Sequence, residues 1–161
     1  MLGKPFKLRL FEIKIPGKIT FVENDFYADG DTLTTIDTPF CRLGISVCHD
    51  IPFPLLAQPH AQVGCKLMVL PDAFSMTTGR SHWKLLSRIR AVDNQVHVAL
   101  VSSARDETGS YDTWGHSMLV DPAGKMGQSA GTAEELVPAI VDLQYLAAER
   151  LQMLMVEYKR G

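Results

Sequence analysis

Short apolar runs alternate with amphipathic stretches through the middle of the chain. The runs occupy residues 43–48, 67–70 and 96–102, and each has the length of a buried strand. Residues 53–63 and 79–95 between them carry apolar side chains at helical spacing. The core-facing side of the longer helix is predicted to consist of Trp83, Leu85, Leu86, Ile89 and Val92. This alternation of strands and helices predicts an α/β layered fold.

The flanking regions add further elements. Residues 7–11 read KLRLF, an alternation that predicts a strand. Residues 115–120 and 136–141 are predicted as strands of a meander, with a turn at residues 121–124. Residues 143–158 are rich in Leu, Ala, Glu and Met and are predicted to form the last helix. No repeat or linker divides the sequence, so we expect one domain or part of one.

Composition narrows the class of protein. The 161 residues are 46% hydrophobic and 21% charged, as in a soluble globular protein. A formal net charge of −2 gives no electrostatic reason to expect nucleic acid or a membrane as partner. The three cysteines have no CxxC spacing, which favours a reducing compartment, and we expect the cytoplasm or alternatively the mitochondrion. Neither a metal nor an organic cofactor is expected.

Cys48 ends the first apolar run, and this position is the main candidate for chemistry. A thiol at the end of a strand that enters a helix meets the backbone N–H groups of the following turn. Those donors would lower the pKa of the thiol and stabilise a developing oxyanion, which suits acyl transfer. The alternative is a buried structural cysteine, and the position alone favours that alternative.

Two charged residues are weaker candidates. Lys7 lies in the predicted strand at residues 7–11, and Glu23 lies among aromatic residues ahead of a glycine turn. Each, taken alone, is better explained as a side chain exposed to water.

Several motifs together resemble the carbon–nitrogen hydrolase (nitrilase) superfamily. FKLRLF at residues 6–11 is similar to its lysine motif, and GISVCHDIPF at residues 44–53 is similar to its cysteine elbow. Among the subfamilies, AFSMTTG at residues 73–79 and RIRAVDNQ at residues 88–95 are most similar to the omega-amidases. The resemblance implies an α/β fold of the four-layer α-β-β-α sandwich type. It also implies hydrolysis of the terminal amide of α-ketoglutaramate or α-ketosuccinamate through a cysteine thioester, with release of ammonia.

The resemblance further implies roles for individual residues. Cys48 would be the nucleophile, Lys7 the cation that stabilises the tetrahedral intermediate, and Glu23 the supporting glutamate. The backbone N–H of His49 would join the oxyanion hole. The residues implied to form the pocket wall are Ala73, Phe74 and Thr78.

The chain also departs from the family pattern. Only six residues precede Lys7, so we expect residues 1–161 to be a partial domain that lacks the N-terminal half and its general-base glutamate. Apolar faces of the sheet should then be open. Near the nucleophile, Pro52 replaces an arginine, Leu55 replaces a glutamate, and Pro59 falls inside a predicted helix.

Three functions therefore stay open. The first is an omega-amidase-like hydrolase of a small-molecule amide, assembled as a homo-oligomer or as a dimer with a full-length relative. The second is a catalytically inactive remnant that acts as a binding or dimerisation partner. The third is a redox-sensitive thiol protein that uses Cys48 or Cys41, although no resolving cysteine is evident.

Overall fold

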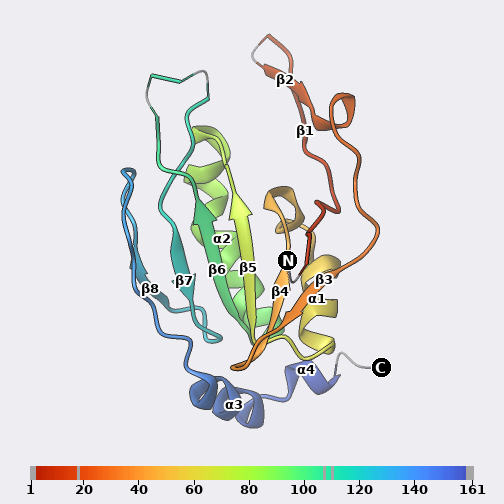
Figure 1. The fold of residues 1–161 in the computed structure, drawn as a ribbon, viewed down its shortest axis with the longest axis vertical. Helices are drawn as coiled ribbons and strands as arrows, with labels where there is room; N and C mark the ends of the chain where they lie inside the picture. Colours follow the sequence, from red (N-terminus) through yellow and green to blue (C-terminus); the bar gives the residue numbers. More distant parts are fainter. Residues whose placement is uncertain (1–2, 18, 107, 110, 159–161) are drawn as a thin grey trace.

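A six-stranded mixed sheet organises the chain (Figure 1). The computed structural model describes residues 3–17, 19–106, 108–109 and 111–158. The strands of the sheet, in spatial order, are β3 (Thr34–Asp37), β4 (Arg42–Ile45), β5 (Leu67–Asp72), β6 (His97–Ser102), β7 (Met118–Val120) and β8 (Met126–Ser129). A separate antiparallel hairpin consists of β1 (Glu12–Ile15) and β2 (Ile19–Val22).

The helices follow the predicted alternation. They are α1 (Pro54–Gln62), α2 (Met76–Asn94), α3 (Leu143–Gln152) and α4 (Met155–Tyr158), with 3-10 turns η1 (Glu23–Asp25) and η2 (Cys48–Asp50). The strands β4, β5 and β6 are parallel, and α1 and α2 connect them. The α/β class predicted from the alternation is therefore confirmed. Because parallel strands end at the same edge of a sheet, the chain segments after β4 and β5 lie close together.

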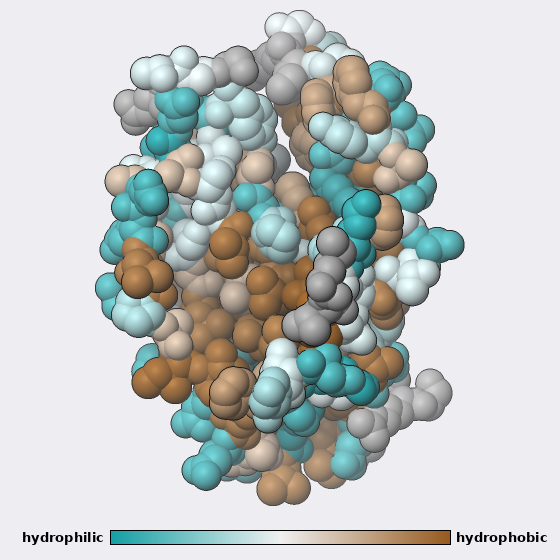
Figure 2. All heavy atoms as spheres, viewed as in Figure 1, coloured by the Kyte–Doolittle hydropathy of each residue, from teal (hydrophilic) through white to brown (hydrophobic). Residues whose placement is uncertain are grey.

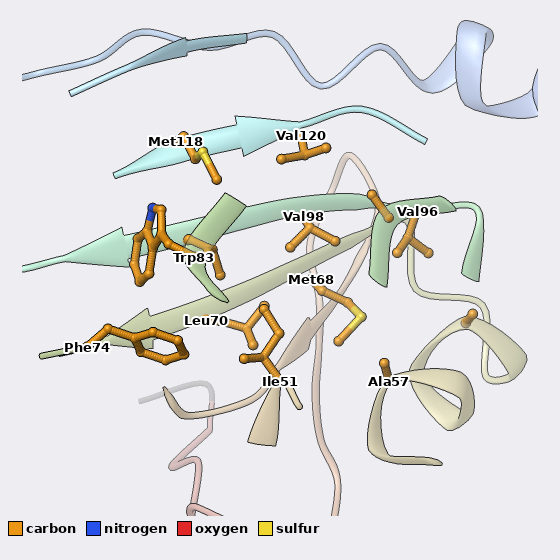
Figure 3. Close-up of a cluster of buried hydrophobic side chains, with 13 residues drawn as sticks. Ile51, Ala57, Met68, Leu70, Phe74, Trp83, Val96, Val98, Met118 and Val120 are labelled. Atoms are coloured by element: carbon orange, nitrogen blue, oxygen red, sulfur yellow. The ribbon is translucent and has the colours of Figure 1, made fainter. Parts of the chain in front are cut away.

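The core lies between the sheet and the helices α1 and α2 (Figure 3). Met68 and Leu70 of β5 and Val98 of β6 occupy alternate strand positions on this face, and none exposes more than 1% of its surface. Trp83 of α2 is also 1% exposed. Side chains of the same face alternate with period two along a strand, so Asp72 points to the same side as Leu70.

The predicted core-facing side of α2 is only partly correct. Trp83 is buried and Leu86 packs against the core, but Leu85 is 54% exposed and Ile89 is 41% exposed. Besides Trp83, the buried residues of α2 are Gly79, Ser87, Arg90, Ala91 and Asn94. Small residues allow close approach on this side: a Cβ at Gly79 would lie 2.3 Å from Cγ of Trp114.

The other face of the sheet carries a second set of apolar side chains. Leu43, Ile45, Val69, Ala99 and Leu119 alternate with the core residues and are half-buried. Figure 2 shows apolar atoms gathered there, and Figure 1 shows no helix of the described residues in front of them. This arrangement agrees with the open apolar face expected from the sequence.

Two predicted strands are wrong. Residues 7–11 are not a strand, because their backbone N–H groups bond to carboxylates, as described below. Residues 136–141 are also irregular, with Leu136 92% exposed and Ile140 86% exposed. Pro138 interrupts that run and has no N–H to donate. The edge of β7 is paired instead with β8, which the predicted turn at residues 121–124 brings back beside it.

The predicted last helix is divided in two. The helix α3 ends before Met153, and α4 starts at Met155. Leu146 and Val156 are buried, so both pieces contribute an apolar contact. No helix in the described part of the chain has the length and apolar character that a membrane crossing needs.

Candidate active site

Cys48 lies in a sharp turn just after β4. Val47 is extended, with φ −124° and ψ 117°, whereas Cys48 has φ 47°, in the left-handed region. This conformation is strained for a residue that is not glycine, and such strain is common at functional sites. The chain then continues into η2 rather than directly into a helix, since α1 begins only at Pro54. The expected helix N-terminus therefore does not start at the thiol.

Asp50 fixes this turn and ties a distant segment to it. Its carboxylate accepts hydrogen bonds from the N–H groups of Val47 (2.9 Å), Leu8 (3.0 Å) and Arg9 (2.8 Å). The residue is 1% exposed. Burial raises the pKa of Asp50, and the three amide donors oppose that rise. Because the bonded amides of Leu8 and Arg9 directly follow Lys7, Asp50 also positions Lys7 beside the turn.

Lys7 and Glu23 form a half-buried ion pair. The Nζ atom of Lys7 lies 2.7 Å from Oε1 and 2.6 Å from Oε2 of Glu23, and the side chains are 12% and 18% exposed. Glu23 also accepts the N–H of Phe11 at 2.7 Å. The water-exposed interpretation of both residues is therefore wrong. The carboxylates of Glu23 and Asp50 take up the amides of residues 8, 9 and 11, which explains why this segment is not a strand.

Asp72 was missed in the sequence and lies against the nucleophile candidate. It ends β5, is 8% exposed, and lies close enough to the Cys48 thiol for the two groups to shift each other's pKa. Neither carboxylate oxygen makes a well-formed hydrogen bond in the described part of the chain. Burial raises the pKa of Asp72 to about 7, while the Cys48 contact and nearby Lys7 oppose this rise. One signal in the sequence could have revealed Asp72. It is a carboxyl at the end of the second apolar run, and in a parallel sheet that end lies beside the end of the run that precedes Cys48.

The thiol of Cys48 is protonated at neutral pH. Burial raises its pKa to about 11, with a further contribution from Asp72. Lys7 and the backbone N–H of Ala73, which donates to the sulfur, act in the opposite direction. The expected lowering of the thiol pKa is therefore wrong, because desolvation and a neighbouring carboxylate outweigh the cation and the amide. Thiolate formation here needs a proton acceptor.

The other predicted site residues are placed as follows. His49 directly follows Cys48, and its ring packs edge-on between Phe11 and Phe53, at centroid distances of 5.0 and 5.3 Å. Burial, then the charge of Lys7, lower the pKa of His49. Ala73 reaches the sulfur through its backbone N–H.

The contacts of Phe74 and Thr78 are with the core and with the start of α2. The Phe74 side chain is 7% exposed and packs against Trp83 at a centroid distance of 5.4 Å, so it supports the site from the core. Thr78 lies in the first turn of α2, where its N–H donates to the hydroxyl of the N-cap residue Ser75 at 3.3 Å. A role for either side chain in contact with a substrate stays a prediction.

Tyr111 is a further residue that the sequence did not reveal. Its hydroxyl donates to the carbonyl of Ala73 at 2.8 Å. Burial raises the pKa of Tyr111, and the charges of Cys48 and Glu23 add to the rise. Tyr111 therefore lies at the site, although it is 53% exposed. No three His, Cys, Asp or Glu side chains among the described residues gather in a way that could hold a metal ion.

Comparison with known proteins identifies the family. A sequence model described as carbon-nitrogen hydrolase matches residues 1–150. The chain belongs to the carbon-nitrogen hydrolase family. Omega-amidase NIT2 of Bos taurus is 52% identical to it over 161 residues, which cover 100% of the chain and 58% of the relative. Omega-amidase NIT2 of Homo sapiens is 50% identical over the same shares.

Solved structures of this hydrolase family agree with the fold. Saccharomyces cerevisiae Nit3, a member of branch 10 of the nitrilase superfamily, superposes with a TM-score of 0.89 at 38% identity. The match covers 100% of this chain and 56% of Nit3. The Caenorhabditis elegans NitFhit protein superposes with a TM-score of 0.87 at 34% identity, covering 96% of this chain and 38% of NitFhit. The nitrilase-type α/β fold is confirmed, and the chain spans 58% of the length of its curated relatives.

Proposed function

We propose that the protein is an omega-amidase-like hydrolase of small terminal amides, with Cys48 as nucleophile. The observation that carries the proposal is the convergence of Cys48, Lys7 and Glu23, from distant segments, on one strained turn. Relatives about half identical over the whole chain carry the name omega-amidase, and this supports the substrate class. Substrates of that class are α-ketoglutaramate and α-ketosuccinamate.

The geometry supports acyl transfer through a thioester. The sulfur attacks the amide carbonyl carbon, and the carbonyl electrons move to oxygen as a tetrahedral oxyanion forms. Lys7, held by Glu23, supplies positive charge next to the reacting atoms, and the His49 N–H is the proposed second donor to the oxyanion. Ammonia then leaves, and water hydrolyses the thioester to the carboxylate and the free thiol.

Glu23 is proposed to position Lys7 rather than to exchange protons with the substrate. Both of its oxygens are bonded to the Lys7 ammonium, and one also accepts the Phe11 N–H. With these bonds made, both oxygens of Glu23 are occupied in holding Lys7 and the segment at Phe11. We also propose that residues 1–161 are a partial domain and that the chain assembles as a homo-oligomer or as a dimer with a full-length relative.

A second function is favoured by one observation. The Cys48 thiol has a pKa raised to about 11, so an unassisted nucleophile would be almost inactive at neutral pH. The alternative is a catalytically inactive protein that binds or dimerises through its open sheet face. This alternative predicts that removal of the thiol changes nothing.

Ammonia release from α-ketoglutaramate by the purified chain separates the two functions. Cys48→Ala should abolish the release, whereas Cys41→Ala should leave it unchanged, because Cys41 is a half-buried thiol outside the site. Intact mass spectrometry should detect an acyl adduct only where Cys48 is present. Release that persists in Cys48→Ala, or no release from the folded wild-type chain, would contradict the hydrolase.

A further inference from the structure

Asp72 is the one group at the site whose hydrogen bonding is left incomplete. It is only 8% exposed, yet neither oxygen makes a well-formed hydrogen bond in the described residues, although the carboxyl lies beside the Cys48 thiol. Asp50, which is buried to a similar extent, accepts three backbone N–H groups. Buried polar groups without partners are rare and unfavourable, so an unpartnered carboxyl aimed at a nucleophile needs an explanation.

The position of Asp72 is set by the sheet rather than by a mobile loop. It is the last residue of β5 and pairs in register with Ser102 of β6. Its N-terminal neighbours on the same face, Leu70 and Met68, are fixed in the core. The residue after it, Ala73, donates its N–H to the Cys48 sulfur. The carboxyl and the amide therefore approach the sulfur from one rigid strand end.

Among the described residues, three further titratable groups interact with the Cys48–Asp72 pair: Lys7, Asp50 and Tyr111. Lys7, Asp72 and Tyr111 face the thiol. Lys7, Asp50 and Cys48 face the Asp72 carboxyl. Lys7 is held by Glu23, Asp50 is held by amides, and the Tyr111 hydroxyl donates to the Ala73 carbonyl. The thiol and Asp72 are left as the groups that can exchange a proton with each other.

We propose that Asp72 is the general base and acid of this site, accepting the proton of the Cys48 thiol and returning it to the leaving nitrogen. This inference rests on the proposed hydrolase function and assigns it a residue that the chain itself supplies. Transfer of the proton from sulfur to carboxylate leaves the total charge of the pair unchanged, so no new charge is buried at that step.

Each step balances in atoms and electrons. The S–H bond of Cys48 breaks, its proton moves to an Asp72 oxygen, and the sulfur electron pair forms the bond to the amide carbon. As the C–N bond breaks, the Asp72 proton moves to nitrogen and ammonia leaves. A water molecule then gives a proton to Asp72 and its oxygen attacks the thioester. The C–S bond breaks, and the proton returns from Asp72 to sulfur.

The raised pKa of Asp72 supports this role. A value of about 7 places the carboxyl near the pH at which a base and an acid are both available. Nearby Lys7 would stabilise the thiolate and the oxyanion that form when the proton has moved.

The test combines two readouts on wild type and Asp72→Asn. The rate at which iodoacetamide alkylates Cys48 is followed by peptide mass spectrometry from pH 6 to pH 12, and ammonia release from α-ketoglutaramate is measured in parallel. Asp31→Asn, an exposed change with the same loss of charge, is the matched control. Asp72→Ser repeats the measurement in case Asp72→Asn does not fold.

The proposal expects opposite effects on the two readouts. Without the neighbouring carboxylate, the thiolate forms more easily, and the alkylation midpoint should fall by about one pH unit or more from its wild-type value. Ammonia release should nevertheless fall by about 100-fold or more, since the proton carrier is lost. A merely structural role would not increase thiol reactivity while it decreases amide turnover.

The remaining outcomes overturn different statements. An alkylation midpoint that does not move excludes Asp72 as the partner of the thiol, whatever the ammonia release. A lower midpoint with wild-type ammonia release excludes it as base and acid. A wild-type chain that releases no ammonia overturns the hydrolase function, and the catalytic role of Asp72 with it. A changed alkylation midpoint in Asp72→Asn would then show only that Asp72 lies beside the Cys48 thiol.

Discussion

The turn after β4 and the last residue of β5 each place a buried aspartate near Cys48. The two aspartates have different surroundings. Asp50, after β4, is 1% exposed and accepts three backbone N–H groups. Asp72, at the end of β5, is 8% exposed and makes no comparable bonds among the described residues. Burial alone therefore does not assign a role to a carboxyl. The first aspartate builds the turn, and the second is the one for which we propose a role in proton transfer.

The largest effect is expected from Asp50→Ala. Three charge-assisted hydrogen bonds are lost, and the backbone N–H groups that made them are left without their acceptor. The free energy of unfolding should therefore fall by about 4 to 6 kcal/mol. Urea denaturation followed by circular dichroism measures it. Asp50→Asn keeps one acceptor oxygen and should lose less. A loss below about 1 kcal/mol in the alanine variant would show that the carboxylate does not hold the turn.

Asp72→Asn should change the pH dependence of stability. The folded-state pKa of Asp72 is about 7, above the 3.8 of an unperturbed aspartate, so the folded state holds this proton more tightly than the unfolded chain. The contribution of Asp72 to stability is therefore most favourable below pH 4 and falls as pH rises to about 7, by about 4 kcal/mol at most.

Urea denaturation of both proteins at pH 4.5 and pH 7.5 gives the difference. Asp72→Asn should lose less stability than wild type over that interval, because its amide does not titrate. Equal losses would show that Asp72 has an ordinary pKa and that the contrast with Asp50 is absent.

Glu23→Gln should have a smaller effect on stability. The amide cannot neutralise Lys7, which is 12% exposed, and the free energy of unfolding should fall by about 1 to 3 kcal/mol. If the hydrolase proposal is correct, ammonia release should fall as well, because Lys7 is no longer held. Unchanged stability and unchanged turnover would show that the pair is not needed to place Lys7.

The smallest effect is expected from Glu12→Gln. Glu12 also pairs with a lysine, Lys14, but the two side chains are 55% and 62% exposed. Water screens such pairs, so the urea midpoint should not move measurably. A shift as large as that of Glu23→Gln would mean that exposure does not separate the two pairs.

Local patterns were sufficient for much of the fold. The runs at residues 43–48, 67–70 and 96–102 and the helix between the last two follow from side-chain periodicity, which depends only on near neighbours. The apolar stripe of α2 was misassigned because small and polar residues, Gly79 and Ser87 among them, are buried where apolar side chains were expected. Residues 136–141 were misassigned because β8, and not this segment, pairs with the edge of β7.

The sequence by itself determined the α/β class, the family and the candidates Cys48, Lys7 and Glu23. Only the tertiary structure decided how they are held and which buried carboxyl lies beside the thiol. The amide of Leu8 finds its acceptor 42 residues away, in Asp50. Asp72 meets Cys48 because two parallel strands end at one edge of the sheet. The pKa of a group depends on solvent exclusion and on charges that lie close in space, and neither can be read from neighbours along the chain.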